Sequence, residues 1–436
     1  MTWMLVVAAV VVGAALLAPA TAGQEVRTVH HSLRNIRYLS LQGSEVVVET
    51  AAGWSFGLQQ ADLRPGGRTL RVRPAVPVPR DAADREGGTS GALAGFPVSA
   101  TVLWNGHRFT GTFGGGLYDA AGLRVPGSPA DVRALLAVSA GLLVAHAGGL
   151  MLFDGKAMHA IHLQGPPADN VSALAFGGGA LWVGYFDQGL AALEDGRWRA
   201  VTVVGPPDAS WVNALCWHDG ALWVGSNAGL GRYDPGREEV AAIYGFDRPV
   251  KGLSVSQGSL VVTESDAVWI ASASGWKEVP LPQEALSGAC LEGESVWAAG
   301  MRGLLAGHGK SWQRFSELNG RLPESWVTAV LPVARQMWVG TYDGGLLELG
   351  HDGRARMVRP RVWVNANALV KIPGAIAVGT MGDGLQIYQQ DRRRWRAVRM
   401  ADGLPADDVT AVVASGATLF VGTRGGLAEL DWTRGH

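Results

Sequence analysis

The chain has 436 residues, a formal net charge of −1 and 17% charged residues, which excludes the strongly basic surface typical of nucleic-acid or anionic-lipid binding. Hydrophobic residues make up 47%, enough for a sizeable core, and the 61 glycines and 17 tryptophans favour turn-rich β structure over helices. The length exceeds that of one small domain and suits a single large repeat array.

The N-terminus has the features of a signal peptide. An apolar run from Trp3 to Leu17 leads to Ala20-Thr21-Ala22, an A-x-A cleavage pattern. We therefore expect residues 1–22 to be removed by cleavage after Ala22, and the mature protein to be periplasmic or secreted. No Lys or Arg precedes the apolar run, so an uncleaved anchor is the alternative. No later stretch of the sequence is long and apolar enough to span a bilayer.

A short motif recurs along the rest of the chain. Its clearest copies read LWVGYFDQGL at 181–190, MWVGTYDGGL at 337–346 and LFVGTRGGL at 419–427. Ten copies are found when weaker ones are included, and most are about 40 residues apart, the period of a four-stranded propeller blade. The sequence therefore predicts an all-β fold, a single-ring β-propeller of about ten four-stranded blades, or nine if the first unit is an irregular cap.

Each unit reads as four short strands separated by Gly and Asp, as tight turns require. In the clearest unit the strands span 171–176, 181–185, 189–193 and 197–201. The first strand alternates between apolar and polar residues in every unit, which indicates one buried and one polar face.

The last unit lacks a fourth strand. It provides strands at 409–413, 418–422 and 426–430, and the chain then ends. Glu25–Val29 resembles the fourth strand of other units, so we expect it to pair with Leu427–Leu430 and close the ring.

One segment interrupts the period. Arg64–Gly95 is rich in Pro, Gly and Arg, and it is predicted to be a long loop or insertion in a propeller that otherwise spans 23–436. The two cysteines, Cys216 and Cys290, occupy the same repeat position in non-neighbouring units, so we expect two buried thiols and no disulfide.

The polar residue of the first strand is the first candidate for ligand binding, because it is expected to line a central channel. The candidate channel residues are Arg37, Arg133, Asn213, Lys251 and Asn367. The position contains no Asp, Glu or His, so it offers no group for acid–base catalysis. Three bases without an acid would favour an anionic ligand such as an acidic sugar. In the structural alternative each base pairs with a loop carboxylate such as Asp131.

The rim of the propeller is the second candidate, where the loop between strands two and three opens beside the loop that enters strand one. The candidate rim residues are Tyr185, Asp187, Trp211, Trp326, Tyr342, Asp343, Asp383 and Arg424. Aromatic faces beside polar groups suit a sugar or a peptide. The alternative is that the acidic residues only form turns and the tryptophans only pack.

The repeat resembles a known family. The pattern G-L-P-x-x-x-V-T-A-V followed by W-V-G-T-x-x-G-G-L is similar to the two-component regulator propeller repeat. It stands here as Gly403-Leu404-Pro405, Val409-Thr410-Ala411-Val412 and Val421–Leu427, and again as Leu322-Pro323, Val327–Val330 and Trp338–Leu346. The resemblance implies a periplasmic sensor like those of hybrid histidine kinases, some of which respond to carbohydrates. The sequence ends at His436 without a kinase, so we expect the sensor part alone.

No catalytic motif was found, whether a G-x-S-x-G elbow, an H-E-x-x-H helix or a P-loop. His159 and His162 would point to opposite faces of a strand, so neither a metal nor a cofactor is predicted. We expect a monomeric, exported, sensor-like binding propeller for a glycan, peptide or protein, and not an enzyme.

Two alternatives stay open. One is a polysaccharide lyase or glycoside hydrolase on a propeller scaffold, and a hydrolase would pair two carboxyls across a pocket, for example from Asp187, Asp343 or Asp383. The other is a protein-interaction platform without a small ligand.

Overall fold

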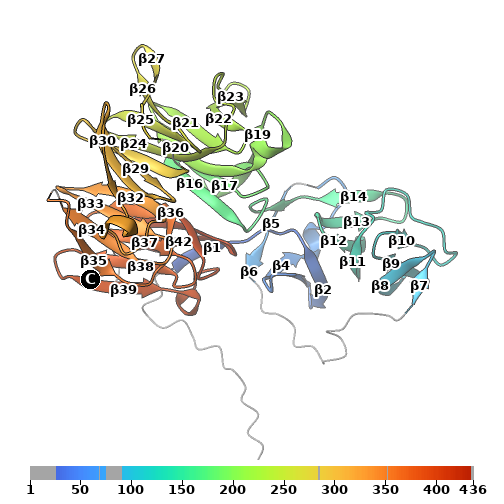
Figure 1. Ribbon diagram of the computed structural model, residues 1–436. Coiled ribbons are helices and arrows are strands. Elements are labelled where there is room, and N and C mark those ends of the chain that lie inside the picture. The colour runs from blue at the N-terminus through green and yellow to red at the C-terminus, as the bar shows by residue number, and fades with distance from the viewer. Residues whose placement is uncertain (1–25, 68, 75–90, 283–284, 351, 434–436) are drawn as a thin grey trace, which may run out of the picture.

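The computed structural model describes residues 26–433 apart from 68, 75–90, 283–284 and 351. The described chain consists of short strands, four 3-10 helices and turns (Figure 1). Its strands form ten four-stranded sheets, four of which are joined in pairs by parallel bridges into two eight-stranded sheets, and one separate two-stranded pair. The prediction of an all-β propeller is therefore confirmed. The predicted signal peptide, residues 1–22, lies outside the described residues.

Seven of the sheets are formed by the chain after residue 170, the last of them with one strand from the N-terminus. In chain order their strands are β16 (Val171–Gly177), β17 (Ala180–Tyr185), β18 (Leu190–Glu194) and β19 (Arg197–Val203); β20 (Val212–His218), β21 (Ala221–Ser226), β22 (Gly229–Asp234) and β23 (Glu239–Ala242); β24 (Val250–Ser256), β25 (Ser259–Glu264), β26 (Val268–Ser272) and β27 (Gly275–Glu278); β28 (Leu286–Glu292), β29 (Ser295–Gly300), β30 (Gly303–His308) and β31 (Ser311–Phe315); β32 (Val327–Val333), β33 (Gln336–Thr341), β34 (Leu346–Gly350) and β35 (Ala355–Arg359); β36 (Val364–Ile372), β37 (Ala375–Thr380), β38 (Leu385–Gln389) and β39 (Arg394–Val398); and β40 (Val409–Ser415), β41 (Thr418–Thr423) and β42 (Gly426–Asp431). The 3-10 helices η2 (Pro207–Ser210), η3 (Glu317–Asn319) and η4 (Met400–Asp402) lie in connections between sheets.

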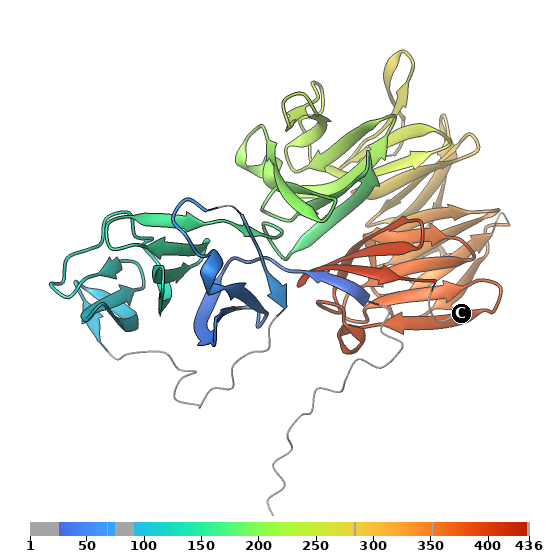
Figure 2. The same cartoon turned by 180° about the vertical axis from the view of Figure 1, so that it is seen from behind.

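These seven sheets form a closed ring (Figures 1 and 2). Their first strands contact one another in chain order, and β40 in turn contacts β16. The fourth strand of the last sheet is β1 (Val26–His30), which runs antiparallel to β42 with Val29 opposite Ala428 and His30 opposite Leu427. The predicted pairing of the N-terminal strand is therefore confirmed.

One contact recurs around the ring. A glycine in the second strand of a sheet lies against the first valine of the next sheet, so closely that a Cβ on the glycine would fall 2.4–2.6 Å from a valine methyl. The pairs are Gly184–Val212, Gly225–Val250, Gly340–Val364, Gly379–Val409 and Gly422–Val171. The last pair joins the final sheet to the sheet that begins at 171, which closes the ring after seven units.

The other three sheets form an open arc beside the ring. Their strands are β2 (Ile36–Gln42), β3 (Glu45–Thr50), β4 (Ser55–Gln59) and β6 (Arg73–Pro74); β7 (Ala92–Leu93), β8 (Phe96–Trp104), β9 (His107–Thr112) and β10 (Gly116–Tyr118); and β11 (Val132–Val138), β12 (Gly141–His146), β13 (Gly149–Phe153) and β14 (Met158–Ile161). The arc also contains η1 (Gln60–Asp62) and a parallel pair, β5 (Leu70–Arg71) with β15 (Leu163–Gln164).

The order of sheets in the arc differs from their order in the sequence. Strand β11 packs against both β8 and β2, whereas β2 and β8 do not pack together as neighbouring first strands do in the described part of the chain. Gly111 lies against Val132 as in the ring, but Glu49 occupies the glycine position in the sheet of β2. The position does not require glycine, because Thr263 and Ala299 hold it inside the ring and their sheets still pack on the next sheet.

The expectation of ten, or nine, blades in one ring is thus corrected to a seven-bladed ring and a three-bladed arc. The repeat period identifies the units, but it does not determine which units become neighbours.

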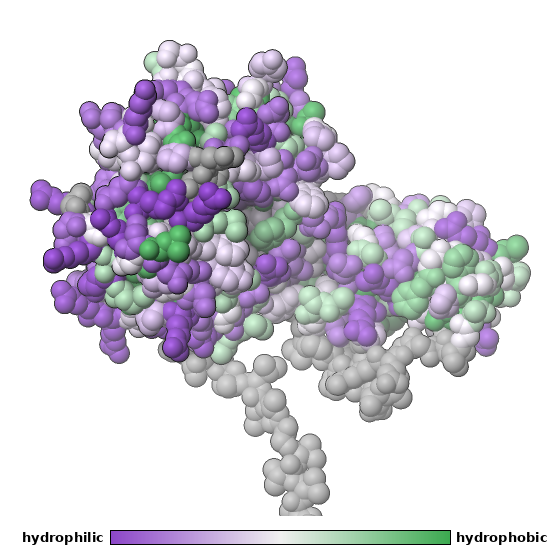
Figure 3. Space-filling view, in the orientation of Figure 1, coloured by the Kyte–Doolittle hydropathy of each residue, from purple (hydrophilic) through white to green (hydrophobic). Residues whose placement is uncertain are grey.

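At the end of the arc formed by β8–β10 the surface is hydrophobic (Figure 3), and its exposed side chains are Phe96, Leu103 and Phe113.

The segment predicted to be a long loop, 64–95, is partly built into the arc. Strand β6 is the fourth strand of the first sheet, with Phe56 opposite Pro74, and β7 pairs with β8. Residues 75–90 lie outside the described part. The expectation that the cysteines form no disulfide is confirmed, since both Cys216 and Cys290 are free thiols, but only Cys290 is buried and Cys216 is partly exposed.

Two crossings of the chain connect the arc to the ring, at 31–35 and at 162–170. His31 donates from Nδ1 to the carbonyl of Gly425 in the ring, at 2.9 Å, and its imidazole stacks on Trp54 of the arc with ring centres 3.5 Å apart. The N–H of Ser32 donates to Oδ1 of Asp169 at 2.5 Å, which links the two crossings. Burial lowers the pKa of His31 to about 4 and raises the pKa of Asp169 to about 6.

The contact between Gly422 and Val171 gives a test of ring closure. Gly422→Ala places a methyl group 2.4 Å from a Val171 methyl, and we expect it to lower the free energy of unfolding by about 1–3 kcal/mol. Gly288→Ala is the matched control, because it lies in a first strand with no atom near the added methyl group. Urea unfolding measures both. Equal effects of the two substitutions would contradict the close contact.

The crossings also predict how stability depends on pH. The lowered pKa of His31 means that the fold favours the neutral imidazole, so its contribution to stability is complete above pH 6.5 and is lost as the pH falls towards 4. The raised pKa of Asp169 means that the fold disfavours the carboxylate, so the protein is destabilised above pH 6, and this destabilisation disappears as the pH falls towards 3.8. The two nearly cancel in the wild-type protein. Asp169→Asn removes the contribution of Asp169 and leaves that of His31. We therefore expect the free energy of unfolding of this variant to fall by about 3 kcal/mol between pH 7 and pH 4, relative to the exposed control Asp187→Asn. Urea unfolding at several pH values measures this, and parallel profiles for the two variants would refute it.

Candidate ligand-binding site

The ring encloses an axial pocket of about 580 Å³ at the end where the first strands begin. Its polar lining comes from the starts of these strands and includes Ser172, Asn213, Lys251, Ser287, Asn365, Asn367 and Thr410. In six of the seven units, the alternation of the first strand therefore brings polar side chains to the pocket, whereas Thr328 of β32 is buried outside the lining.

Many of these polar groups also hold the ring together. The hydroxyl of Thr410 donates to the carbonyl of Val171 at 2.6 Å, and that of Ser287 donates to the carbonyl of Val327 at 2.9 Å. In each case the side chain of one sheet bonds to the first residue of the next sheet. These hydroxyl protons are therefore already used by the fold, and the pocket depends on other side chains for ligand donors.

A bulge in β36 fills part of the pocket. Its pairing with β37 passes from Val364 directly to Leu369, so more residues leave the ladder than in other first strands. Asn367 lies in this bulge and donates from Nδ2 to the carbonyls of Ser172, at 3.0 Å, and Asn213, at 2.6 Å. These two carbonyls belong to sheets across the axis, so the bulge bridges the channel.

Because of the bulge, the prediction for Asn367 is corrected. The polar position of the first strand is occupied by Asn365 and not by Asn367. Val364 packs on Gly340 as the first valine of other sheets does, and the next residue, Asn365, donates to the carbonyl of Val409. The sequence contains a signal for this, since a Trp-Val pair begins the first strand at 211–212, 326–327 and 363–364.

Lys251 on β24 is the cation in the wall of the pocket. It is half-buried, and within the described residues it forms no ion pair. Arg424 at the mouth lies 3.8 Å from a carboxylate oxygen of Asp408 and over the ring of Phe186, at 5.7 Å from its centre. No Asp or Glu is among the described residues that line the pocket, so its local charge is positive.

The other two predicted channel bases lie elsewhere. Arg37 is on β2 and Arg133 is on β11, both in the arc, so neither shares the axis with Lys251. Arg133 forms an ion pair with Asp131 at 2.9 Å, which is the structural alternative given above. Of the three bases expected in the channel, the pocket therefore contains only Lys251, because the units of Arg37 and Arg133 are not in the ring.

Aromatic side chains form one side of the mouth. Tyr342 stacks on Trp326 with ring centres 4.3 Å apart and planes 3° apart, and its ring centre lies 4.1 Å from that of Trp363. Trp326 and Trp363 both line the pocket, and 38% of the surface of Trp326 is exposed. These rings offer flat apolar faces within reach of the polar wall.

Three other rim candidates do not reach this pocket. Tyr185 is only 1% exposed and packs in the core, where burial raises its pKa, so its expected place on the rim is corrected. Trp211 and Asp187 are exposed but lie outside the pocket lining.

The acidic rim residues belong to the loops. Asp383 accepts a hydrogen bond from Arg399 at 2.9 Å, and the N–H of Asp343 donates to Glu324 at 2.7 Å. Asp187, Asp343 and Asp383 do not line the pocket, so the carboxyl pair that a hydrolase would need is not formed there by these residues. The described residues also contain no cluster of three or more His, Cys, Asp or Glu suited to a metal.

No protein-family model matches the chain, and no curated protein matches it in sequence. Among solved structures it is similar to PorZ, a bacterial surface component of the type-IX secretion system of Porphyromonas gingivalis, with a TM-score of 0.56 and 15% identity over 91% of this chain and 62% of PorZ. It is also similar to the WD40 propeller domain of Doa1, with a TM-score of 0.50 and 15% identity over 60% of this chain and 92% of that domain.

A third similar structure is the extracellular domain of the hybrid two-component system BT4673 from B. thetaiotaomicron, with a TM-score of 0.49 and 13% identity over 93% of this chain and 60% of that one. The chain spans about three fifths of the length of PorZ and of the BT4673 domain. At these identities the likeness to PorZ and Doa1 shows the β-propeller fold alone. Within the described residues, no helix has the length and apolar character needed to cross a bilayer.

Proposed function

We propose that this chain is an exported, sensor-like binding propeller, and that the axial pocket of its seven-bladed ring binds a glycan through an anionic group, such as the carboxylate of an acidic sugar. The observation that carries the proposal is Lys251, a half-buried cation without an ion pair among the described residues, in a pocket whose described lining contains no acid.

The surroundings of Lys251 strengthen its attraction for an anion. Low-dielectric walls focus the field of a charge in a cleft, so one unpaired lysine has a larger effect here than on an open surface. A charge-assisted hydrogen bond to an anion is worth about 1.5–3 kcal/mol. The pocket is therefore selective by charge.

The aromatic mouth suits the rest of a sugar. Trp326 and Trp363 present flat apolar faces, and the amides of the bulge in β36 lie close by. Binding pockets commonly combine such apolar walls with a few fixed polar groups. The same charge would also attract a peptide carboxylate, which the test below separates from a sugar.

Export and a sensor-like function rest on other observations. The A-x-A pattern at 20–22 supports export, as do neighbours described as a bacterial surface component and an extracellular domain. The resemblance to the two-component regulator propeller repeat supports a sensor-like function.

A glycan array tests the class of ligand. We expect the protein starting at residue 23 to bind glycans that contain uronic or sialic acid, and not their neutral counterparts, with affinity that decreases as salt increases. Short peptides with free and amidated C-termini form the second arm. Preference for neutral glycans, or binding only to the free C-termini, would contradict an acidic sugar as ligand.

Substitutions locate the binding site. We expect Lys251→Ala to weaken binding about tenfold or more and to flatten the salt dependence, because it removes the charge in the pocket. Lys371→Ala is the matched control, since Lys371 is exposed near the opposite end of a first strand. Trp326→Ala should weaken binding at all salt concentrations. Titration calorimetry measures these effects, and equal affinities of the Lys251 and Lys371 variants would place the ligand elsewhere.

A further inference from the structure

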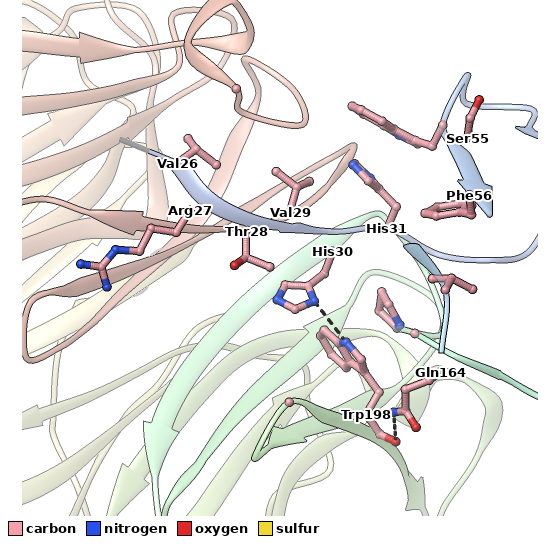
Figure 4. A pocket seen from close by; sticks show the side chains of 16 residues that line it. Val26, Arg27, Thr28, Val29, His30, His31, Ser55, Phe56, Gln164 and Trp198 are labelled. Carbon is pink, nitrogen blue, oxygen red and sulfur yellow. Dashed lines mark hydrogen bonds between the residues drawn. The ribbon is translucent and has the colours of Figure 1, made fainter. Parts of the chain in front are cut away.

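A second cavity lies between the ring and the arc. It has a volume of about 600 Å³, and one of its walls is the whole of β1 together with His31 (Figure 4). The arc provides Trp54, Ser55 and Phe56, and Trp198 of β19 lies on the ring side. We call this cavity the interlobe cleft. It is separate from the axial pocket and shares none of its lining residues.

Strand β1 is an edge strand. It is the last strand in its sheet, paired with β42 on one side only. An edge strand presents unpaired N–H and C=O groups that can pair with another extended chain. Here this edge borders the cleft.

The pairing pattern shows which residue presents these groups. A two-residue turn joins β41 and β42, so Thr423 and Gly426 exchange both of their hydrogen bonds. Because bonded and non-bonded pairs alternate, Ala428 bonds to β41, and Val29 opposite it directs its N–H and C=O away from β42. Within the described residues, Val29 forms no other main-chain hydrogen bond.

Two buried polar atoms of the cleft residues also lack partners among the described residues. They are Nε2 of His31 and Oγ of Ser55. His31 is only 7% exposed, and its Nδ1 proton is donated to the carbonyl of Gly425, so Nε2 is left as an acceptor. Buried polar atoms are rarely left without a partner, and each such case needs an explanation. Both atoms are shielded from solvent by the surrounding residues, so neither is open to a ligand in the cleft.

The remaining lining is apolar and aromatic. Trp54, Phe56 and Val72 face β1 from the arc, and Trp198 closes the ring side, where its indole N–H donates to His30. The charged group nearest the edge, Arg27, is already paired with Asp431. The cleft therefore combines a main-chain edge with apolar walls, without a free charge among its described lining.

We propose that the interlobe cleft binds an extended, uncharged segment of a partner protein, which adds as a further strand to the free edge of β1. Its main chain pairs with the N–H and C=O of Val29. Its alternate side chains, apolar or aromatic, pack on Trp54, Phe56 and Trp198. This is β-strand addition, in which main-chain bonds give affinity and side-chain contacts give specificity.

A phage-displayed library of random linear peptides is the probe, with the protein starting at residue 23 as the target. We expect enriched peptides to have apolar residues at alternate positions. A synthetic peptide of that sequence should bind the wild-type protein, and Val29→Pro should weaken binding about tenfold, because proline removes the N–H and places its ring on the edge. Ala397→Pro is the matched control, since Ala397 holds the same place on outer strand β39, opposite Gln386.

A second measurement does not depend on a variant. Hydrogen exchange of the Val29 amide in the wild-type protein should become slower when the peptide is added. Lys251→Ala should bind the peptide as the wild type does, which separates this site from the axial pocket. The proposal is overturned if no peptide is enriched, or if the edge of β1 only mediates self-association of the chain. It is also overturned if the peptide binds Val29→Pro as well as the wild type, if Lys251→Ala abolishes binding, or if the peptide leaves hydrogen exchange at Val29 unchanged.

Discussion

The close approach of a glycine to a valine between neighbouring sheets is the constraint on which this structure depends. At Gly340 and Gly422 a side chain would collide with the first valine of the next sheet, so the absence of a Cβ sets the distance between sheets. Where the residue is Glu49, the series of sheets ends. Thr263 and Ala299 hold the glycine position in the other two sheets that lead to a next sheet, so the contact fixes five of the seven junctions in the ring and does not by itself decide where the ring closes.

The specificity of the axial pocket arises from exceptions to the repeat. A regular unit uses its polar first-strand residue to bond to the next sheet, as Thr410 does with Val171, and this leaves little for a ligand. Lys251 forms no ion pair among the described residues, and the bulge at Asn367 breaks the ladder. The residues that depart from the consensus are thus the ones that give the pocket its charge and shape.

The sequence was sufficient for the strands and for the pairing of β1, because turn glycines, alternation and an unpaired last strand are local or directly visible features. It was not sufficient for the number of blades, since every unit has nearly the same period whichever unit it contacts. Asn367 was placed by counting backwards from the second strand, and the count failed because the bulge adds residues that the Trp363-Val364 pair would have revealed.

Strand β1 both completes the ring and leads into the arc. The arc is inserted between β1 and β16, so the strand that completes the ring is also the strand from which the arc departs. His30 bonds to Glu429 in the ring, and the next residue, His31, stacks on Trp54 in the arc. A segment bound along β1 would therefore contact the closing strand and the arc at once. Because binding stabilises the state that binds, occupancy of the interlobe cleft would strengthen both the closure of the ring and the attachment of the arc.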